Sequence, residues 1–442
     1  MIIWQDLNKQ ERAQVLARPF SNKDRVLSTT VSEIIERVEN DGDTALKAFS
    51  QKFDGVELPQ LRLSEERKRT ILATLNPDRQ AAIELAYNNI RAFHLAQKPQ
   101  DIEVDTAPGV NCRLLNRAIG SVGLYIPGGS APLPSTVLML GIPAQLAECR
   151  RVVLCTPAFM DENQEMGVTT ELVYAAKLCG IEDIFLTGGA QAVAAMAYGT
   201  ESIPKVDKIF GPGNRFVTEA KLQVSLDASG AAIDMPAGPS EVLIIADSSA
   251  NPFFLAADLL SQAEHGIDSQ VILLCNDQRI LAEVESELET QVQALSRCDI
   301  ATESLKQSRL ILTRSVQESV EISNDYAPEH LIVQTDNPES LLPALSSAAS
   351  IFLGPYTPES AGDYASGTNH VLPTYGYART LSSLSLTDFY RRFTVQRISA
   401  QGLKTIGPSI MTLAEAEGLD GHRNAVRIRL EALEQEAESC RV

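Results

Sequence analysis

The fold of this chain is decided by stretches such as Val271-Ile272-Leu273-Leu274-Cys275, an uninterrupted apolar run of strand length. Similar runs recur along the chain, and stretches with helical periodicity separate them. They lie at Val122–Tyr125, Val152–Cys155, Ile184–Leu186, Lys208–Phe210, Val242–Ala246, Leu310–Leu312, Leu331–Gln334 and Ile351–Leu353. Apolar strands that alternate with amphipathic helices are typical of parallel sheets covered on both faces. The sequence therefore predicts an α/β fold.

The length of 442 residues exceeds what one hydrophobic core usually supports, so we expect more than one domain. Asp234–Ser240 is rich in Pro and Gly, which suits a passage from one sheet to another. Before Ser121 the chain is mostly helical, for instance over Val31–Ser50 and Arg79–Gln97. After about Asp388 it is polar and has no series of strands. We expect such a polar end to pack against another domain or subunit.

The composition limits what the chain can bind. A formal net charge of -19, with no basic stripe interleaved with aromatics, argues against nucleic acid as a partner. No apolar run approaches the roughly 20 residues of a membrane helix, and the first residues resemble neither a secretion signal nor a transit peptide. The seven cysteines are scattered without a C-x-x-C pair, which suits a reducing compartment. We expect a soluble, cytoplasmic protein.

Four of the five histidines lie in polar segments or beside Gly and Pro, and the exception, His94, is expected at the surface of an amphipathic helix. Gln262 and His265 are three residues apart near the end of a helix that Gly266 terminates. This spacing lets an amide oxygen and an imidazole approach one metal ion. For His265 alone, an interaction with the dipole of its helix is the more common explanation.

Glu329 and His330 lie between Pro328, which ends a helix, and the start of a strand. Their carboxylate could activate water and their imidazole could accept a hydroxyl proton near neutral pH. A solvated pair in a loop is an equally common explanation. The long loop after the last strand adds Asp363 and His370 as metal or acid/base candidates, unless it is only a loop capped by an Asx turn.

A further segment, Glu415–His422, places acidic residues and one histidine around a glycine turn. By itself it would be interpreted as surface. Gln262, His265, Asp363 and His422 together offer nitrogen and oxygen donors without cysteine. This donor set is appropriate to zinc and acceptable to manganese or cobalt.

Glycine turns that follow a strand and precede a helix present backbone N–H groups to anionic ligands. Such turns lie at Tyr125–Ser130, Thr187–Ala192 and Gly211–Phe216. None has the full G-x-G-x-x-G pattern, since Phe216 takes the last position in the nearest approach. Their number favours a nucleotide ligand, although tight packing in α/β folds explains many glycine turns.

These motifs, in this order, resemble the histidinol dehydrogenase family over nearly the whole chain. The matching motifs are Val122–Gly129, Gly188–Ala192, Gly211–Asn214, Ala237–Glu241, Gln262–His265, Ala327–His330 and Gly421–His422. The resemblance implies two incomplete Rossmann-like, doubly wound domains that lack the dinucleotide fingerprint, and a homodimer with shared active sites. It implies a helical N-terminal arm (1–22), a first domain with most metal and catalytic residues (23–128 and 240–380), a second domain on the NAD side (129–239), and a tail that crosses to the partner's site (381–442).

The resemblance also implies roles for single residues. One Zn²⁺ per subunit would be held by Gln262, His265, Asp363 and His422 of the partner subunit. NAD would be contacted by Tyr125, Gln191 and Asn214. The substrate would be contacted by Ser240, Gln262, His265, His330, Asp363, Glu417 and His422.

The implied reaction is the oxidation of L-histidinol to L-histidine through L-histidinaldehyde with two NAD, at the end of histidine biosynthesis. Zinc would position the substrate's imidazole and amine. His330 would take the hydroxyl proton as hydride leaves, and Glu329 would deprotonate the water that adds to the aldehyde. His370 would orient the substrate or its loop.

Other interpretations are weaker but remain open. A zinc hydrolase would use the same donors and a glutamate base but would leave the glycine turns unused. A non-enzymatic, metal-dependent interaction protein would not need the Glu329-His330 pair. A cysteine nucleophile, Cys149 or Cys155, is disfavoured because both flank an apolar strand, where burial raises the pKa of a thiol.

Overall fold

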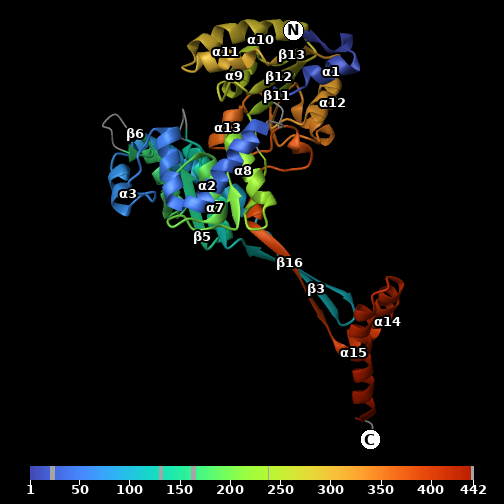
Figure 1. Ribbon diagram of the computed structural model, residues 1–442. Coiled ribbons are helices and arrows are strands. Elements are labelled where there is room, and N and C mark those ends of the chain that lie inside the picture. Colours follow the sequence, from blue (N-terminus) through green and yellow to red (C-terminus); the bar gives the residue numbers. More distant parts are fainter. Residues whose placement is uncertain (20–24, 129–132, 161–165, 237, 440–442) are drawn as a thin grey trace. The chain divides into compact units, whose positions relative to one another are not determined.

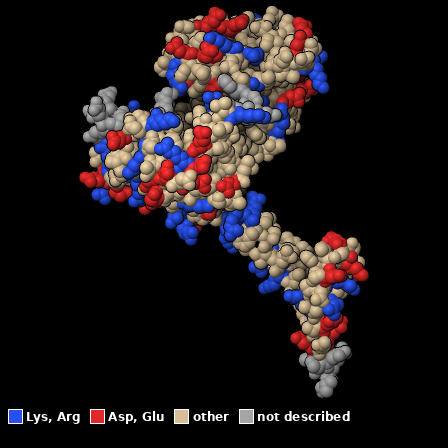
Figure 2. All heavy atoms as spheres, in the orientation of Figure 1, with Lys and Arg blue, Asp and Glu red and all other residues tan. Residues whose placement is uncertain are grey.

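The computed structural model describes residues 1–19, 25–128, 133–160, 166–236 and 238–439 (Figure 1). It divides into two units. Unit 1 comprises Met1–Gln97 and Ile119–Phe389, and unit 2 comprises Lys98–Ala118 and Tyr390–Val442. Within the described residues, no helix combines the length and the apolar character needed to cross a membrane. On the face of unit 1 seen in Figure 2, basic and acidic side chains are interspersed.

The larger parallel sheet of unit 1 has the strand order β1-β13-β12-β11-β14-β15. Its strands are β1 (Ile2–Ile3), β11 (Glu241–Ala246), β12 (Gln270–Cys275), β13 (Arg309–Leu312), β14 (His330–Gln334) and β15 (Ser350–Leu353). One face is covered by α9 (Pro252–Ala263), α10 (Gln278–Gln291) and α11 (Cys298–Leu305). The other face packs against Trp4 and α12 (Val316–Tyr326), and Val15, the last residue of α1 (Lys9–Val15), packs against the same cluster.

The smaller parallel sheet of unit 1 has the order β10-β9-β4-β5-β8. Its strands are β4 (Ser121–Tyr125), β5 (Arg151–Thr156), β8 (Asp183–Leu186), β9 (Lys208–Phe210) and β10 (Ala232–Ile233). Its helices are α5 (Pro134–Ala147), α6 (Thr170–Leu178), α7 (Gly189–Tyr198) and α8 (Arg215–Leu226). Outside them pack α2 (Arg25–Phe49), α3 (Glu65–Leu72) and α4 (Pro77–Leu95). A short antiparallel pair, β6 (Phe159–Met160) and β7 (Met166–Gly167), lies after β5.

Both sheets are wound in the same way. In the larger sheet β11 is central, β12 and β13 follow on one side, and β14 and β15 follow on the other, with β1 added at the edge beyond β13. In the smaller sheet β4 is central, β5 and β8 follow on one side, and β9 and β10 follow on the other. This is the arrangement of doubly wound α/β domains. The predicted α/β class is therefore confirmed, and every expected strand is present to within about one residue at each end.

Unit 2 contains strands that the sequence did not reveal. An antiparallel sheet of order β16-β3-β2 is formed by β2 (Ile102–Ala107), β3 (Val110–Ala118) and β16 (Tyr390–Ile398). It is followed by α14 (Ala400–Ala416) and α15 (Asp420–Ser439). The residues of β2 are almost all exposed, and those of β16 are mostly exposed. These strands lack the continuous apolar runs that mark the strands of the two parallel sheets.

The division of the chain differs from the expected one at residues 23–128. We expected these residues to form one domain with residues 240–380. Instead, β4 pairs with β5 and β9 of the smaller sheet. In addition, α2 packs on α7 and α8, and α4 packs on α5. A helix that precedes its sheet carries no sequence pattern that says which sheet it will cover. Residues 381–389 also belong to unit 1, where Phe389 stacks on Phe210.

A buried ion pair holds the turn between β9 and α8. Lys221 and Asp234 have side chains 3% and 0% exposed and contact each other. Lys221 Nζ donates to the carbonyl of Gly211 at 2.8 Å, and the N–H of Gly211 donates to Asp234 Oδ2 at 2.8 Å. Gly211 has φ +124, and a Cβ there would lie 2.2 Å from the carbonyl oxygen of Tyr125. Glycine is therefore required at this close approach.

We expect Lys221→Met to lower the free energy of unfolding by about 3–5 kcal/mol, because it leaves the Asp234 carboxylate buried without its cation. Urea unfolding followed by circular dichroism measures this loss. The matched control is Lys306→Met, which removes an exposed pair with Glu303 and should cost less than about 1 kcal/mol. Losses of equal size in both variants would contradict the role of the buried pair.

Candidate active site

The candidate site lies at the amino ends of two adjacent strands of the larger sheet. Glu241 begins β11 and His330 begins β14, and Val242 is the register partner of His330. The helix after β11 runs back across the sheet, so its end brings Gln262 to the same edge. Sites in doubly wound folds usually lie at the carboxyl ends of the strands. Here the polar residues gather at the opposite ends.

The backbone of Glu241 holds both residues of the Glu-His pair. Its N–H donates to Glu329 Oε2 at 2.8 Å, and its carbonyl oxygen lies 3.1 Å from His330 Nδ1. A carbonyl only accepts, so Nδ1 carries a hydrogen, and in the neutral form of the ring Nε2 keeps its lone pair. His330 Nε2 is buried and makes no hydrogen bond. The imidazole is therefore oriented as a proton acceptor at Nε2.

Carboxylates surround the imidazole of His330. Its Nδ1 lies 3.5 Å from Glu329 Oε2 and 3.8 Å from Glu359 Oε1, and its Nε2 lies 3.9 Å from Asp363 Oδ1. Burial acts to lower the pKa of His330, but Glu359, Glu329 and Asp363 together raise it well above its ordinary value. The site is thus strongly negative around one base.

A cluster of possible metal ligands adjoins this base. Donor atoms of His265, Glu359 and Asp363 all lie within 4.8 Å of one another. Glu359 and Asp363 come from α13 (Glu359–Tyr364), where a spacing of four residues puts them on one face. Glu359 is 1% exposed, its Oε2 has no hydrogen-bond partner, and burial raises its pKa to about 8. A buried carboxylate oxygen without a partner, beside an imidazole, fits a divalent cation.

The amide of Gln262 adjoins the same cluster. One end of it lies 2.5 Å from Glu359 Oε1 and the other lies 3.0 Å from the N–H of Glu241. Without a cation, the end beside Glu359 has to be the nitrogen, because two oxygens would repel each other. If a cation drew the oxygen to that end, the nitrogen would lie 3.5 Å from Glu329 Oε2 but would face the N–H of Glu241, also a donor, so the amide would have to move. Gln262 therefore adjoins the cluster, and its amide satisfies the metal-free arrangement.

The loop after α13 is fixed by histidines on both sides. His370 Nδ1 lies 2.9 Å from the carbonyl oxygen of Asp363, and its Nε2 lies 3.2 Å from the hydroxyl of Thr136. His94, expected at the surface, is instead fully buried, with Nε2 at 3.2 Å from Asn369 Nδ2. The surface prediction was wrong because this loop covers its helix, a long-range contact that helical periodicity cannot reveal.

The residues expected to contact NAD lie at the carboxyl ends of strands of the smaller sheet. Tyr125 ends β4, and its buried hydroxyl accepts the N–H of Gly189 at 3.1 Å. Burial raises the pKa of Tyr125 to about 12. Gln191 is buried in the first turn of α7, and Asn214 caps α8 through its side-chain oxygen. Gly129, Ser130 and Ala237, which belong to the quoted motifs, fall outside the described residues.

The remaining expected residues divide between the two units. Ser240 is half-buried directly before Glu241 in unit 1. Glu417, at the end of α14, and His422, in the first turn of α15, are both exposed residues of unit 2. Burial raises the pKa of the Cys155 and Cys149 thiols, that of Cys149 to about 12, which leaves both thiols protonated.

Sequence reasoning missed two residues of this site. Glu359 could have been found from its spacing of four to Asp363 on a short helix. Glu241 acts through its backbone groups, and no side-chain pattern reports such a role.

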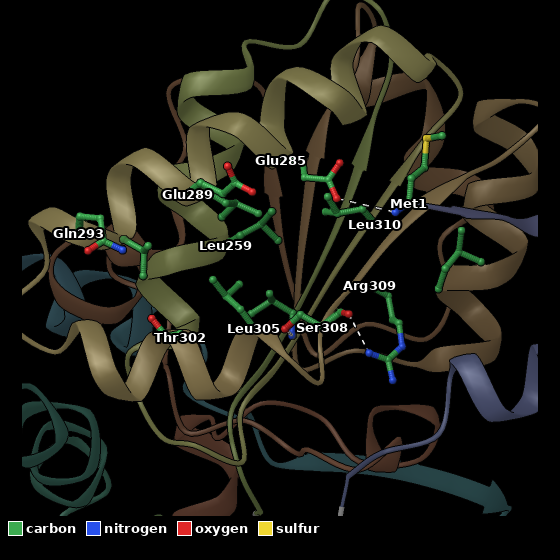
Figure 3. A pocket seen from close by; sticks show the side chains of 14 residues that line it. Met1, Leu259, Glu285, Glu289, Gln293, Thr302, Leu305, Ser308, Arg309 and Leu310 are labelled. Carbon is green, nitrogen blue, oxygen red and sulfur yellow. Dashed lines mark hydrogen bonds and ion pairs between the residues drawn. The ribbon is translucent and has the colours of Figure 1, made fainter.

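A cavity of about 590 Å³ lies elsewhere in unit 1 and contains none of these residues (Figure 3). It is bounded by α10, α11 and β13, with Leu288, Leu305 and Leu310 among its apolar lining. Glu285, at its rim, lies 3.9 Å from the amino group of Met1. The polar cluster is the better candidate for chemistry, because His330 Nε2 and Glu359 Oε2 in it are buried without a hydrogen-bond partner.

Comparisons with known proteins identify the family. Residues 17–430 match the family model described as Histidinol dehydrogenase. The chain is 57% identical to the histidinol dehydrogenase of Colwellia psychrerythraea over 98% of both chains, and 55% identical to that of Vibrio parahaemolyticus over 98% of this chain and 99% of the relative. The crystal structure of histidinol dehydrogenase from Elizabethkingia anophelis matches with a TM-score of 0.92 and 47% identity, over 97% of each chain. The chain therefore belongs to the histidinol dehydrogenase family and is an oxidoreductase.

Proposed function

We propose that this chain oxidises L-histidinol to L-histidine through L-histidinaldehyde, with one Zn²⁺ per subunit and two NAD, as the last steps of cytoplasmic histidine biosynthesis. One observation carries the proposal: the Glu241 backbone holds Glu329 and His330 side by side next to the cluster of His265, Glu359 and Asp363. Two bases beside a set of metal donors suit two successive oxidations at one carbon.

His330 serves the first oxidation. Its Nδ1–H is bound to the carbonyl of Glu241, so its Nε2 is the atom that accepts the hydroxyl proton of the alcohol. As the C–O double bond forms, the hydride on the same carbon passes to NAD. The aldehyde then remains in the site.

Glu329 serves the second oxidation. One of its oxygens is bound to the N–H of Glu241, which fixes the carboxylate in place. It takes a proton from the water that adds to the aldehyde. The resulting hydrate anion would pass its hydride to a second NAD, and the carboxylic acid so formed would release its proton to solvent to become the carboxylate of the product.

Zinc would be held by Gln262, His265, Asp363 and His422 of the partner subunit, with the carboxylate of Glu359 against the same cluster. When bound, the ion would hold the substrate's imidazole and amine and offset part of the negative charge around His330. Ser240 and Glu417 complete the proposed substrate contacts.

NAD would lie at the carboxyl edge of the smaller sheet, beside Tyr125, Gln191 and Asn214. This edge is where doubly wound folds bind nucleotides, at the point where the strand order reverses between β4 and β9. The first turn of α7 offers backbone N–H groups to the phosphates.

A homodimer would supply the partner's His422. Several large apolar side chains of unit 2 are each more than one-third exposed, and a second subunit could cover them. They are Ile102, Val104, Ile398, Leu413, Leu419 and Ile428. Glu417 and His422 lie at the turn between the two helices of this unit.

The direct test is absorbance at 340 nm, which reports NADH when the purified protein meets L-histidinol and NAD. We expect NADH to form and two equivalents to accompany each L-histidine. Hydrolytic products without NADH would instead identify a zinc hydrolase.

We expect prolonged chelation to abolish the oxidation of histidinol, and added zinc, manganese or cobalt to restore it, because the donor set is nitrogen and oxygen only. Elemental analysis and activity are measured on the same samples. Full activity in protein shown to be metal-free would contradict the proposed metal site.

Because the two bases serve different steps, we expect their variants to lose activity in different half-reactions. Glu329→Gln should impair oxidation of the aldehyde by roughly 10²–10⁴-fold, and its reduction to the alcohol much less, because only oxidation needs an activated water. His330→Asn should impair the alcohol step. The half-reactions are measured separately, starting from histidinaldehyde with NAD or NADH. Equal losses in both steps for both variants would disprove this division.

A shared site predicts complementation between inactive variants. His265→Ala and His422→Ala each remove a zinc ligand, but a mixed dimer has one site with both defects and one intact site. Random pairing after refolding should recover roughly a quarter of wild-type activity, since half of the dimers are mixed. Mixtures that demonstrably exchange subunits yet stay inactive would exclude a shared site.

A further inference from the structure

Arg18, in the N-terminal segment, contacts Glu241, the residue whose backbone supports the catalytic pair. Arg18 forms a two-pronged ion pair with Glu241, in which Nη2 donates to Oε2 at 2.9 Å and Nε donates to Oε1. The two side chains are only 14% and 4% exposed. Glu241 is the residue whose backbone binds Glu329 and His330, so Arg18 holds the side chain of that residue.

The same guanidinium also holds the segment that leads into the catalytic pair. It lies over the ring of Tyr326 at 4.1 Å and donates through Nη2 to the carbonyls of Tyr326 at 3.0 Å and Ala327 at 3.4 Å. Ala327 has φ +54, a left-handed conformation that a non-glycine residue adopts only when its surroundings impose it. Two residues later the chain reaches Glu329.

A third segment meets at this point. The N–H of Tyr375 donates to Glu241 Oε1 at 3.1 Å, and Tyr375 also has a left-handed φ of +54. The carboxylate of Glu241 therefore receives an arginine fork and one backbone N–H in a buried position. If Arg18 is removed, the carboxylate stays buried with a single neutral donor, and the start of β11 has to shift for it to find water.

We propose that Arg18 is a positioning residue for the catalytic pair, which it holds by tying the start of β11 to the turn that precedes Glu329. The inference rests on the proposed roles of Glu329 and His330. Arg18 touches neither the reacting atoms nor the residues expected to contact NAD. Its effect depends on the planar fork of arginine, which lysine cannot reproduce.

The test compares Arg18→Ala and Arg18→Lys with Arg12→Ala in zinc-loaded protein. Arg12 is the matched control, because its guanidinium also lies over an aromatic ring and also donates to a backbone carbonyl. It lies 5.1 Å from the centre of the Trp4 ring and donates to the carbonyl of Trp4 at 3.2 Å, and it contacts neither Glu241 nor the catalytic pair. We expect both Arg18 variants to lose about 10- to 100-fold in kcat in both half-reactions. KM for NAD should change by less than about twofold, since NAD would lie on the other sheet.

Chemical rescue makes the test specific to the fork. Millimolar methylguanidinium should restore kcat of Arg18→Ala at least several-fold, and methylammonium should not. If Arg18→Ala does not fold, Arg18→Lys decides the question, because it retains the charge and loses only the fork. An unchanged kcat in Arg18→Lys, or an equal loss in Arg12→Ala, would overturn the inference. Failure of the wild-type protein to oxidise histidinol would instead overturn the proposed function.

Discussion

The site depends on the two backbone groups of one residue, Glu241. The N–H of this residue fixes the carboxylate of Glu329, and its carbonyl fixes the imidazole of His330, so one backbone unit orients both side chains at the start of the neighbouring strand. Backbone groups at the start of a central strand move less than side chains, because strand pairing holds them on both sides. A rigid support of this kind keeps two bases at a fixed separation and sets which nitrogen of His330 can accept a proton.

Charge is the second constraint. Three buried or half-buried carboxylates, those of Glu329, Glu359 and Asp363, lie close to one imidazole, and the buried carboxylate of Glu241 interacts electrostatically with that of Glu329. Burial of so many negative groups is unfavourable unless cations balance them. Arg18 balances Glu241, and the donor atoms of His265, Glu359 and Asp363 leave room for a metal to balance the others. The amide of Gln262 donates to Glu359 and accepts from the N–H of Glu241 when its nitrogen faces this cluster.

Much of the fold and part of the site could be predicted from sequence, for physical reasons. The apolar strands were found because burial on both faces makes them continuous, whereas the exposed β2 and β16 have no such pattern. Spacing and loop context indicated Gln262, His265, Asp363, Glu329 and His330 as candidates, and the family resemblance then implied a role for each. His94 and Arg18 could not be placed, because each is buried by a segment far along the chain. Glu241 acts through its backbone, which side-chain chemistry does not reveal.

The most direct test of this account is the tautomer of His330 in the zinc-loaded protein. Nitrogen NMR of ¹⁵N-labelled histidine side chains, recorded through the alkaline pH range and assigned with His330→Asn, distinguishes the two neutral forms. The hydrogen bond to the carbonyl of Glu241 predicts a protonated Nδ1 and an unprotonated Nε2. A neutral His330 that carries its proton on Nε2 would contradict the central role of the Glu241 backbone.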